Sequence, residues 1–207
     1  MSLINQTNQL KKSKIKNLIA KRIKEFKNLG KKSSKEWFKE LCFCILTANS
    51  TAERCIEVHC RVGDDFLRLN KAKLRNKLRG LGCRFHTKRA GYISESNQYR
   101  NSLKKTIKSS KDDNERREWL VKNIKGLGYK EASHFLRNIG YNDLAIIDFH
   151  IIDLLSKNRL ITKPRTLNKN KYLEIENLLR ELSKKLNITL AELDLYLWYL
   201  ETGKILK

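Results

Sequence analysis

Residues 124–140, I-K-G-L-G-Y-K-E-A-S-H-F-L-R-N-I-G, combine a turn that contains two glycines with an apolar face at helical spacing. Ala132, Phe135 and Ile139 lie three and four residues apart, which places their side chains on one side of a helix. Between this helix and the preceding helical run W-L-V-K-N-I, only K-G-L-G-Y remains to reverse the chain. The segment therefore predicts two short helices joined by a glycine hairpin.

The hairpin has the features of a phosphate-binding turn. Gly126 and Gly128 permit positive φ angles, and their backbone amides can approach another molecule because no side chain intervenes. Successive amides in such a turn, together with the positive end of the next helix, favour a bound phosphate. We expect Leu127 to point inward and brace the turn. The alternative is that both glycines only terminate helices.

The rest of the chain also has a helical pattern, which predicts an all-α fold. Proline occurs once, and no stretch alternates polar and apolar residues for long enough to require a sheet. Three S/T-x-x-E capping boxes mark helix starts: Ser33 with Glu36, Ser50 with Glu53, and Thr189 with Glu192. The expected helices are 8–28, 34–47, 51–61, 71–79, 86–99, 113–124, 130–139, 149–158, 171–186 and 190–201. Residues 101–113 are expected to form a polar loop.

The charge of the chain favours a polyanionic partner. Among 207 residues, 45 are Lys or Arg and 22 are Asp or Glu, and the resulting formal charge of +23 is spread along the chain. Nucleic acid is the partner that best accounts for such an excess, and a lysine-rich, solvated surface is the alternative. No apolar run approaches the roughly 20 residues of a membrane span, and no signal peptide is evident. We therefore expect an intracellular, cytoplasmic protein without a membrane segment.

The five cysteines do not form a metal-binding pattern. Cys42 and Cys44 lie inside the apolar run F-K-E-L-C-F-C-I-L and are expected to be core residues. No C-x-x-C pair exists, and no cysteine follows Cys83. The spacing therefore argues against a zinc site or an iron–sulfur cluster, and we expect no metal.

Two motifs that follow one another along the chain resemble a family of DNA repair enzymes. The order helix, h-G-h-G, helix, where h is apolar, resembles the helix-hairpin-helix DNA-binding motif. Lys130 lies where bifunctional members of the helix-hairpin-helix DNA glycosylase superfamily carry their lysine nucleophile, and Asp148-Phe149-His150 resembles their D-x-H. The resemblance covers nearly the whole chain and is closest to the archaeal second type of 8-oxoguanine DNA glycosylase/AP lyase.

The resemblance implies a reaction and two catalytic residues. Lys130 is expected to attack the anomeric carbon of the damaged nucleotide and form an imine, after which β-elimination cuts the strand. Asp148 is expected to stabilise the positive charge that develops on the sugar. No cofactor is needed. In the alternative, Lys130 is a surface charge and Asp148 is only a helix N-cap. His150 contacts a DNA phosphate or is an ordinary first-turn histidine.

The resemblance also implies residues that hold the flipped nucleotide and fill its gap. Asn49 is expected to enter the gap, and Arg54 and Arg84 to contact the orphaned cytosine. Surface and loop arginines are the alternative for these two. Phe85 and Trp198 are expected to stack on either face of the base.

The last residue of the sequence is also expected to contact the base. Lys207 matches a lysine that helps this group to distinguish 8-oxoguanine from guanine. The alternative is a frayed terminal residue. The short amphipathic segment before it favours docking of the tail.

Together these features predict a single catalytic unit of two helical lobes with the active site in the cleft between them. Lobe one comprises about 1–35 plus 160–207, and lobe two comprises about 36–159, with the helix-hairpin-helix at 113–139. The expected activity is excision of 8-oxoguanine from double-stranded DNA followed by strand cleavage, for which a monomer suffices. The alternatives are a glycosylase/lyase for oxidised pyrimidines and a DNA-binding module without catalysis.

Overall fold

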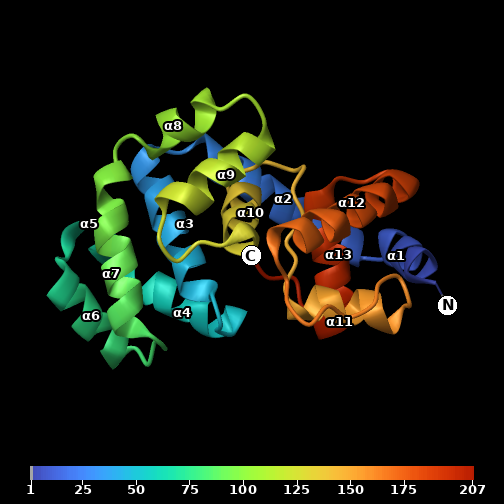
Figure 1. The fold of residues 1–207 in the computed structure, drawn as a ribbon, viewed down its shortest axis with the longest axis horizontal. Helices are drawn as coiled ribbons and strands as arrows, with labels where there is room; N and C mark the ends of the chain where they lie inside the picture. The colour runs from blue at the N-terminus through green and yellow to red at the C-terminus, as the bar shows by residue number, and fades with distance from the viewer. Residues whose placement is uncertain (1) are drawn as a thin grey trace.

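The computed structural model describes residues 2–207, which form α-helices and one 3-10 helix but no strand (Figure 1). The prediction of an all-α chain is confirmed. The helices are α1 (Leu3–Lys11), α2 (Ile15–Lys31), α3 (Ser34–Thr47), α4 (Ala52–Val62), α5 (Asp65–Arg68), α6 (Lys71–Gly80), α7 (His86–Ser96), η1 (Asn97–Tyr99), α8 (Leu103–Ser109), α9 (Asp113–Asn123), α10 (Tyr129–Asn138), α11 (Phe149–Lys157), α12 (Lys169–Leu186) and α13 (Leu190–Thr202). Within the described residues, no helix has both the length and the apolarity that crossing a bilayer requires.

The buried side chains form two main clusters. The first cluster draws on α3 to α10, and the second on α1, α11, α12 and α13. In Figure 1, α3 to α7 lie on the left and the helices of the second cluster on the right, with α2 and α10 between them. A smaller cluster packs α2 against α13. Ile147, Ile151 and Leu155 belong to the second cluster, so we propose that the boundary between the lobes lies near residue 144 instead of residue 159.

The N-terminal helical region differs from the prediction of one helix at 8–28. Two helices, α1 and α2, are separated at Lys12-Ser13-Lys14. The Ser13 hydroxyl donates to Leu10 O at 2.8 Å and accepts from Ile15 N at 3.2 Å. This local hydrogen bonding competes with the helical pattern and accounts for the break.

The prediction of a loop at 101–113 is wrong, because α8 lies within it. Leu103 and Ile107 are fully buried in the first cluster. Their spacing of four residues places both side chains on one face of a helix. That face packs on α3, so tertiary packing forms a short helix within a polar segment.

The predicted capping boxes are only partly present. Thr189 and Glu192 cap α13 as expected. Ser33 is the N-cap of α3 but makes no side-chain capping bond, and the N-cap of α4 is Thr51 instead of Ser50. The Ser50 hydroxyl instead lies 3.0 Å from a guanidinium nitrogen of Arg89, which donates to it.

Candidate active site

The glycine hairpin joins α9 and α10, and the two glycines have different roles. Gly126 has a φ angle of +87°, and a Cβ atom there would lie 2.4 Å from Cδ2 of Tyr92, so the position requires glycine. Gly128 has a φ angle of −92°, which other residues adopt, and its N–H donates to Glu131 Oε2 at 3.2 Å. Leu127 is buried, which confirms its predicted orientation. Phosphate binding by the hairpin stays a prediction, and Glu131 now occupies one of the amides concerned.

Lys130 lies at the second position of α10, directly after the hairpin. Its side chain is 22% exposed, and Nζ lies 3.6 Å from Glu131 Oε1. Burial raises the pKa of the Cys44 thiol, and the charges of Lys207 and Lys130 both oppose that rise. Two lysines that are far apart in the sequence therefore act on the same side chain of α3.

Asp148 is the N-cap of α11, and its Oδ1 accepts from Ile151 N at 3.0 Å. The capping role weighed for it is therefore real, and one carboxylate oxygen remains for other contacts. Phe149, which follows it, is 66% exposed. The ring of His150 lies 4.0 Å from that of Phe149 and meets Trp198 edge-on at 4.9 Å. The D-F-H segment thus forms a row of aromatic rings that leads to α13.

The loop between α3 and α4 presents Asn49 in the left-handed region, with a φ angle of +55°. Arg84 Nη1 donates to Asn49 O at 3.4 Å. Arg89, which is only 3% exposed, donates through Nη2 to Ala48 O at 2.5 Å and to Ser50 Oγ at 3.0 Å. The sequence analysis did not single out Arg89, because a lone arginine in T-K-R-A-G has no local sign of a buried partner.

Arg54 lies on the first turn of α4 and faces the turn before α7. Its guanidinium donates to Leu81 O and pairs with Glu57 Oε2 at 2.6 Å. Gly82 has a φ angle of +67°, and a Cβ atom there would lie 2.5 Å from Arg54 Nη2. Arg54, Arg84 and Arg89 line one pocket of about 100 Å³. The structure therefore brings together the two predicted arginines.

Lys207 is docked, which answers the question of whether it is frayed. Its Nζ lies 2.8 Å from Glu40 Oε2, 3.4 Å from His59 Nδ1 and 4.1 Å from the centre of the Phe43 ring. In Figure 1 the end marked C lies between the two halves of the molecule, beside α10. The tail is thus packed against the centre of the fold.

Comparisons with known proteins identify the family of this chain. The family model described as 8-oxoguanine DNA glycosylase matches residues 19–188. An 8-oxoguanine DNA glycosylase/AP lyase of Methanocaldococcus jannaschii is 54% identical over the full length of both chains, and one of Korarchaeum cryptofilum is 48% identical over 99% of this chain and 98% of its own.

This chain belongs to the 8-oxoguanine DNA glycosylase family.

Solved structures extend the similarity to the fold. The M. jannaschii 8-oxoguanine glycosylase/lyase, crystallised in complex with 15mer DNA containing 8-oxoguanine, has a TM-score of 0.96 and covers 99% of both chains. The 8-oxoguanine DNA glycosylase of Thermotoga maritima is 40% identical, with a TM-score of 0.92 and coverage of 99% of this chain and 98% of its own. The predicted helix-hairpin-helix glycosylase fold is confirmed.

The two aromatic residues predicted to stack on the base lie in different halves of this family member. Phe85 is the residue before α7, has a φ angle of +54° and is 50% exposed. The Arg84 guanidinium lies 5.2 Å from its ring centre. Trp198 lies on α13, and its Nε1 is buried without a hydrogen-bond partner in the protein. Such an exposed ring and an unpaired donor are both suited to a ligand, and the stacking roles stay predictions.

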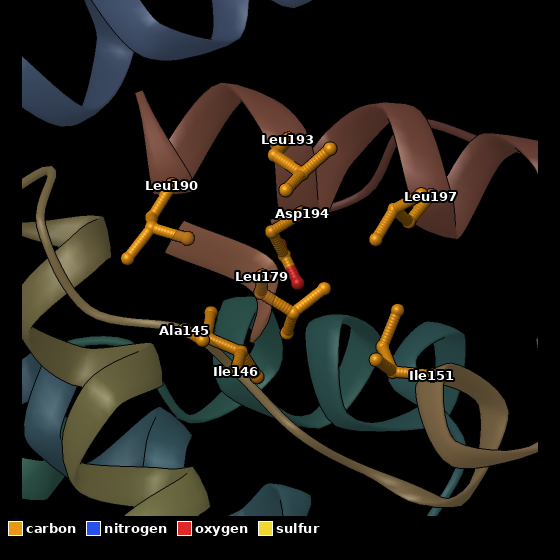
Figure 2. A pocket seen from close by; sticks show the side chains of 8 residues that line it. All are labelled: Ala145, Ile146, Ile151, Leu179, Leu190, Leu193, Asp194 and Leu197. Atoms are coloured by element: carbon orange, nitrogen blue, oxygen red, sulfur yellow. The ribbon is translucent and has the colours of Figure 1, made fainter. Parts of the chain in front are cut away.

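Asp194 is a buried charged residue that the sequence analysis did not select. It is buried on α13 and forms an ion pair with Arg137 of α10. Figure 2 shows its carboxylate among apolar residues such as Ile146 and Leu197. Burial raises the pKa of Asp194 to about 6, and Asp148 acts in the same direction, whereas Arg137 and Lys130 oppose it.

The charges of both predicted catalytic groups, Lys130 and Asp148, thus act on Asp194. The sequence did offer one sign of this ion pair, because Arg137 and Asp194 each place a charge on an otherwise apolar helix face.

Proposed function

We propose that this chain flips 8-oxoguanine out of duplex DNA, releases the base and cuts the strand through a Schiff base on Lys130. The observation that carries the assignment of residues is the convergence of two helix starts. Lys130 lies in the first turn of α10 and Asp148 is the N-cap of α11, and the charges of both act on the buried Asp194. The full-length similarity to 8-oxoguanine DNA glycosylase/AP lyases supports the same reaction.

In the first step, the neutral amine of Lys130 forms a bond to C1′ of the damaged nucleotide. The C1′–N9 bond breaks, its electron pair leaves with the base, and the base takes up a proton. Asp148 stabilises the positive charge on the sugar while this bond breaks. The nitrogen gives up one proton, which balances the proton taken up by the base. Its lone pair then forms the C1′=N bond as the C1′–O4′ bond opens, and O4′ takes a proton from water, which leaves an iminium at C1′ and a hydroxyl at C4′.

In the second step, the iminium makes the C2′ proton acidic. Loss of that proton drives β-elimination, in which the C3′–O3′ bond breaks and the 3′ phosphate leaves. Water then hydrolyses the imine and regenerates Lys130. The protein supplies the amine and the carboxylate, and every other reactant is DNA or water.

The remaining predicted residues hold the DNA. Asn49 fills the gap left by the flipped nucleotide, and Arg54 and Arg84 contact the cytosine opposite. Phe85 and Trp198 stack on the base. The hairpin and His150 contact phosphates, and Lys207 contacts the base. The substrate is double-stranded DNA with oxidised guanine, which places the enzyme inside the cell, and one copy of the chain contains all of these groups.

Borohydride trapping tests the assignment of the nucleophile. The wild type should give a covalent adduct with an 8-oxoguanine duplex, and Lys130→Gln should reduce the trapping rate at least about 1000-fold. Lys125→Gln is the matched control, because Lys125 lies in the same hairpin but is 70% exposed and paired with Glu95. An adduct that persists in Lys130→Gln would exclude this role. A thymine glycol duplex tests the substrate, and a preference for it would contradict the choice of 8-oxoguanine.

Asp148→Asn separates catalysis from helix capping. Asparagine caps helices as well as aspartate does, so the variant should fold normally. Release of 8-oxoguanine should fall about 100-fold, because the carboxylate charge is lost, while DNA binding changes little. Single-turnover base release and a melting curve measure the two effects. A variant that melts much earlier but retains its rate would show that capping is the main role of Asp148.

A further inference from the structure

We propose that Glu40 is a positioning residue for base recognition, because it holds the Lys207 ammonium in a fixed place beside the helix that carries Lys130. This inference rests on the proposed function. Glu40 lies on α3 and does not touch the predicted catalytic residues, so it acts through Lys207. The sequence analysis did not select it, and its role follows from contacts between segments that are far apart in the chain.

Both oxygens of the Glu40 carboxylate have partners. Oε2 lies 2.8 Å from Lys207 Nζ, and Oε1 accepts from Asn138 Nδ2 at 2.6 Å. The carboxylate is only 4% exposed, so its charge is removed from water. A buried charge without a partner is costly, and the Lys207 ammonium is the cation that pairs with it. Glu40 therefore favours a docked tail over a solvated one.

His59 and Phe43 complete the cradle around the ammonium. His59 Nε2 lies 3.1 Å from Lys39 O, which accepts only if Nε2 carries the proton. His59 Nδ1 is then an acceptor, and it faces Lys207 Nζ at 3.4 Å. Burial and the Lys207 charge lower the pKa of His59 to about 4, so the neutral form persists at neutral pH. The Phe43 ring lies 4.1 Å away and adds a cation–π contact.

The cradle lies beside α10, the helix that carries the predicted nucleophile Lys130. Burial lowers the pKa of His134 well below its ordinary value, and Lys130 and Lys207 both act in the same direction. His134 lies one turn after Lys130 on α10, and its ring meets Phe43 edge-on at 5.6 Å. Lys207 is therefore held against the face of α10 that begins with Lys130.

A continuous row of polar contacts links the Lys207 cradle on α3 to Asp194 on α13. Asn138 Oδ1 accepts from Arg137 Nε at 3.1 Å and from Nη2 at 2.9 Å, and Arg137 pairs with Asp194 on α13. Guanine and 8-oxoguanine differ only at N7 and C8, so a side chain that distinguishes them must be held within about 0.5 Å. The row Lys207, Glu40, Asn138, Arg137 and Asp194 provides that support from α3, α10 and α13.

A double-mutant cycle tests the proposal with Glu40→Gln, Lys207→Gln and the double variant. Three quantities are measured in a single turnover: excision of 8-oxoguanine, excision of guanine, and cleavage of a preformed abasic site. Glu40→Gln should lower the ratio of 8-oxoguanine to guanine excision about tenfold, as should Lys207→Gln. The double variant should lose no more than Lys207→Gln alone, because Glu40 acts through Lys207.

Two results would overturn the proposal. One is an unchanged ratio in Glu40→Gln, and the other is a double variant whose loss equals the product of the two single losses. Cleavage of the preformed abasic site needs no base recognition and should persist in all variants. If the wild type also fails to cleave it, the proposed function fails instead.

Two further variants control for folding. Glu176→Gln alters a carboxylate that is equally buried but paired with Arg117, away from the cradle, and it should leave the excision ratio unchanged. If Glu40→Gln does not fold, His59→Gln replaces it, because glutamine offers one donor and one acceptor in the same place. This variant should shift the ratio in the same direction by a smaller factor, and an unchanged ratio would contradict the cradle.

Discussion

Two regions of the candidate site are built in opposite ways. The loop side consists of Asn49, Arg54, Arg84, Phe85 and Arg89, and the tail side consists of Glu40, His59, Arg137, Asn138, Asp194 and Lys207. On the loop side, the Arg54 side chain is 46% exposed and Phe85 is 50% exposed. On the tail side, Arg137 and Asp194 are 5% and 8% exposed. Each arginine of the loop side donates to one backbone carbonyl, whereas the charges of the tail side pair with each other.

The difference leads to separate expectations for how the two regions respond to DNA. An exposed guanidinium that donates to a backbone carbonyl can exchange that carbonyl for a base edge or a phosphate at little cost. A buried ion pair cannot separate without leaving a charge unpaired. We therefore expect the loop side to change its contacts on binding and the tail side to keep them. Substitutions should affect affinity on the loop side and stability on the tail side.

Arg137→Leu should have the largest effect on stability. It leaves Asp194 buried without its partner, which costs about 3–5 kcal/mol and lowers Tm by roughly 10 °C. Thermal unfolding at pH 8 measures the loss. Arg117→Leu breaks the equally buried pair with Glu176 and should cost a similar amount without altering excision by the folded protein. A small loss for Arg137→Leu would show that the tail side is no more rigid than the loop side.

Acidification should weaken the tail side through His59. The folded state lowers the pKa of His59 from 6.5 to about 4, so stability is lost as pH falls through this window, because only the unfolded chain takes up the proton. Relative to His59→Gln, the wild type should lose about 2 kcal/mol between pH 7 and pH 5. Urea unfolding of both proteins measures the difference.

The comparison of the two proteins removes the contribution of Asp194, which has the opposite sign. The pKa of Asp194 is raised to about 6, so its stabilising contribution is present at low pH and is lost as pH rises to this value. A difference between wild type and His59→Gln that does not change with pH would contradict the burial of His59.

Arg89→Lys tests the one arginine of the loop side that is buried, as the charges of the tail side are. Lysine keeps the charge but cannot donate at once to Ala48 O, Ser50 Oγ and Cys83 Sγ, so stability should fall by about 1 kcal/mol. Affinity for the duplex should fall too, because the loop that carries Asn49 is released. Arg116→Lys is the control, since Arg116 holds the backbone of Ile107 and Ser110, and it should affect stability alone. Equal affinities for both variants would contradict the role of Arg89.

Arg54→Ala should have the smallest effect on stability, below about 1 kcal/mol, because its ion pair is exposed. Affinity for a duplex with 8-oxoguanine opposite cytosine should nevertheless fall about tenfold. Arg61→Ala is the matched control, because Arg61 lies on the same helix and pairs with the same Glu57. Binding titrations at several salt concentrations distinguish the two. Equal losses for Arg54 and Arg61 would indicate a general charge effect.

The sequence predicted those parts of the molecule that local pattern determines. The hairpin, the cap at Thr189 and the buried Cys42 and Cys44 all follow from short-range spacing or hydrophobicity. The break at Ser13 and the helix at Leu103 were missed, because one depends on a side-chain hydrogen bond and the other on packing against α3.

The site was predicted unevenly for a related reason. The predicted residues came from motifs that resemble a known family, and the structure brings Arg54 and Arg84 to one pocket. Glu40 contacts Asn138 and Lys207 across 98 and 167 residues of sequence. Nothing in F-K-E-L-C-F indicates such partners. The row of polar contacts from Lys207 to Asp194 therefore follows only from the three-dimensional structure.

The contact between the glycine hairpin and α7 sets the distance from the hairpin to Phe85. Gly126 packs on Tyr92 and Lys125 pairs with Glu95 at 2.9 Å, both toward the C-terminal end of α7, whereas Phe85 precedes its first residue. Tyr92 lies seven positions after Phe85, a rise of about 10 Å along the helix. α7 thus separates the glycine hairpin from the exposed ring of Phe85. If both predicted DNA contacts hold, we expect the spacing between them to be set by this helix before any DNA is bound.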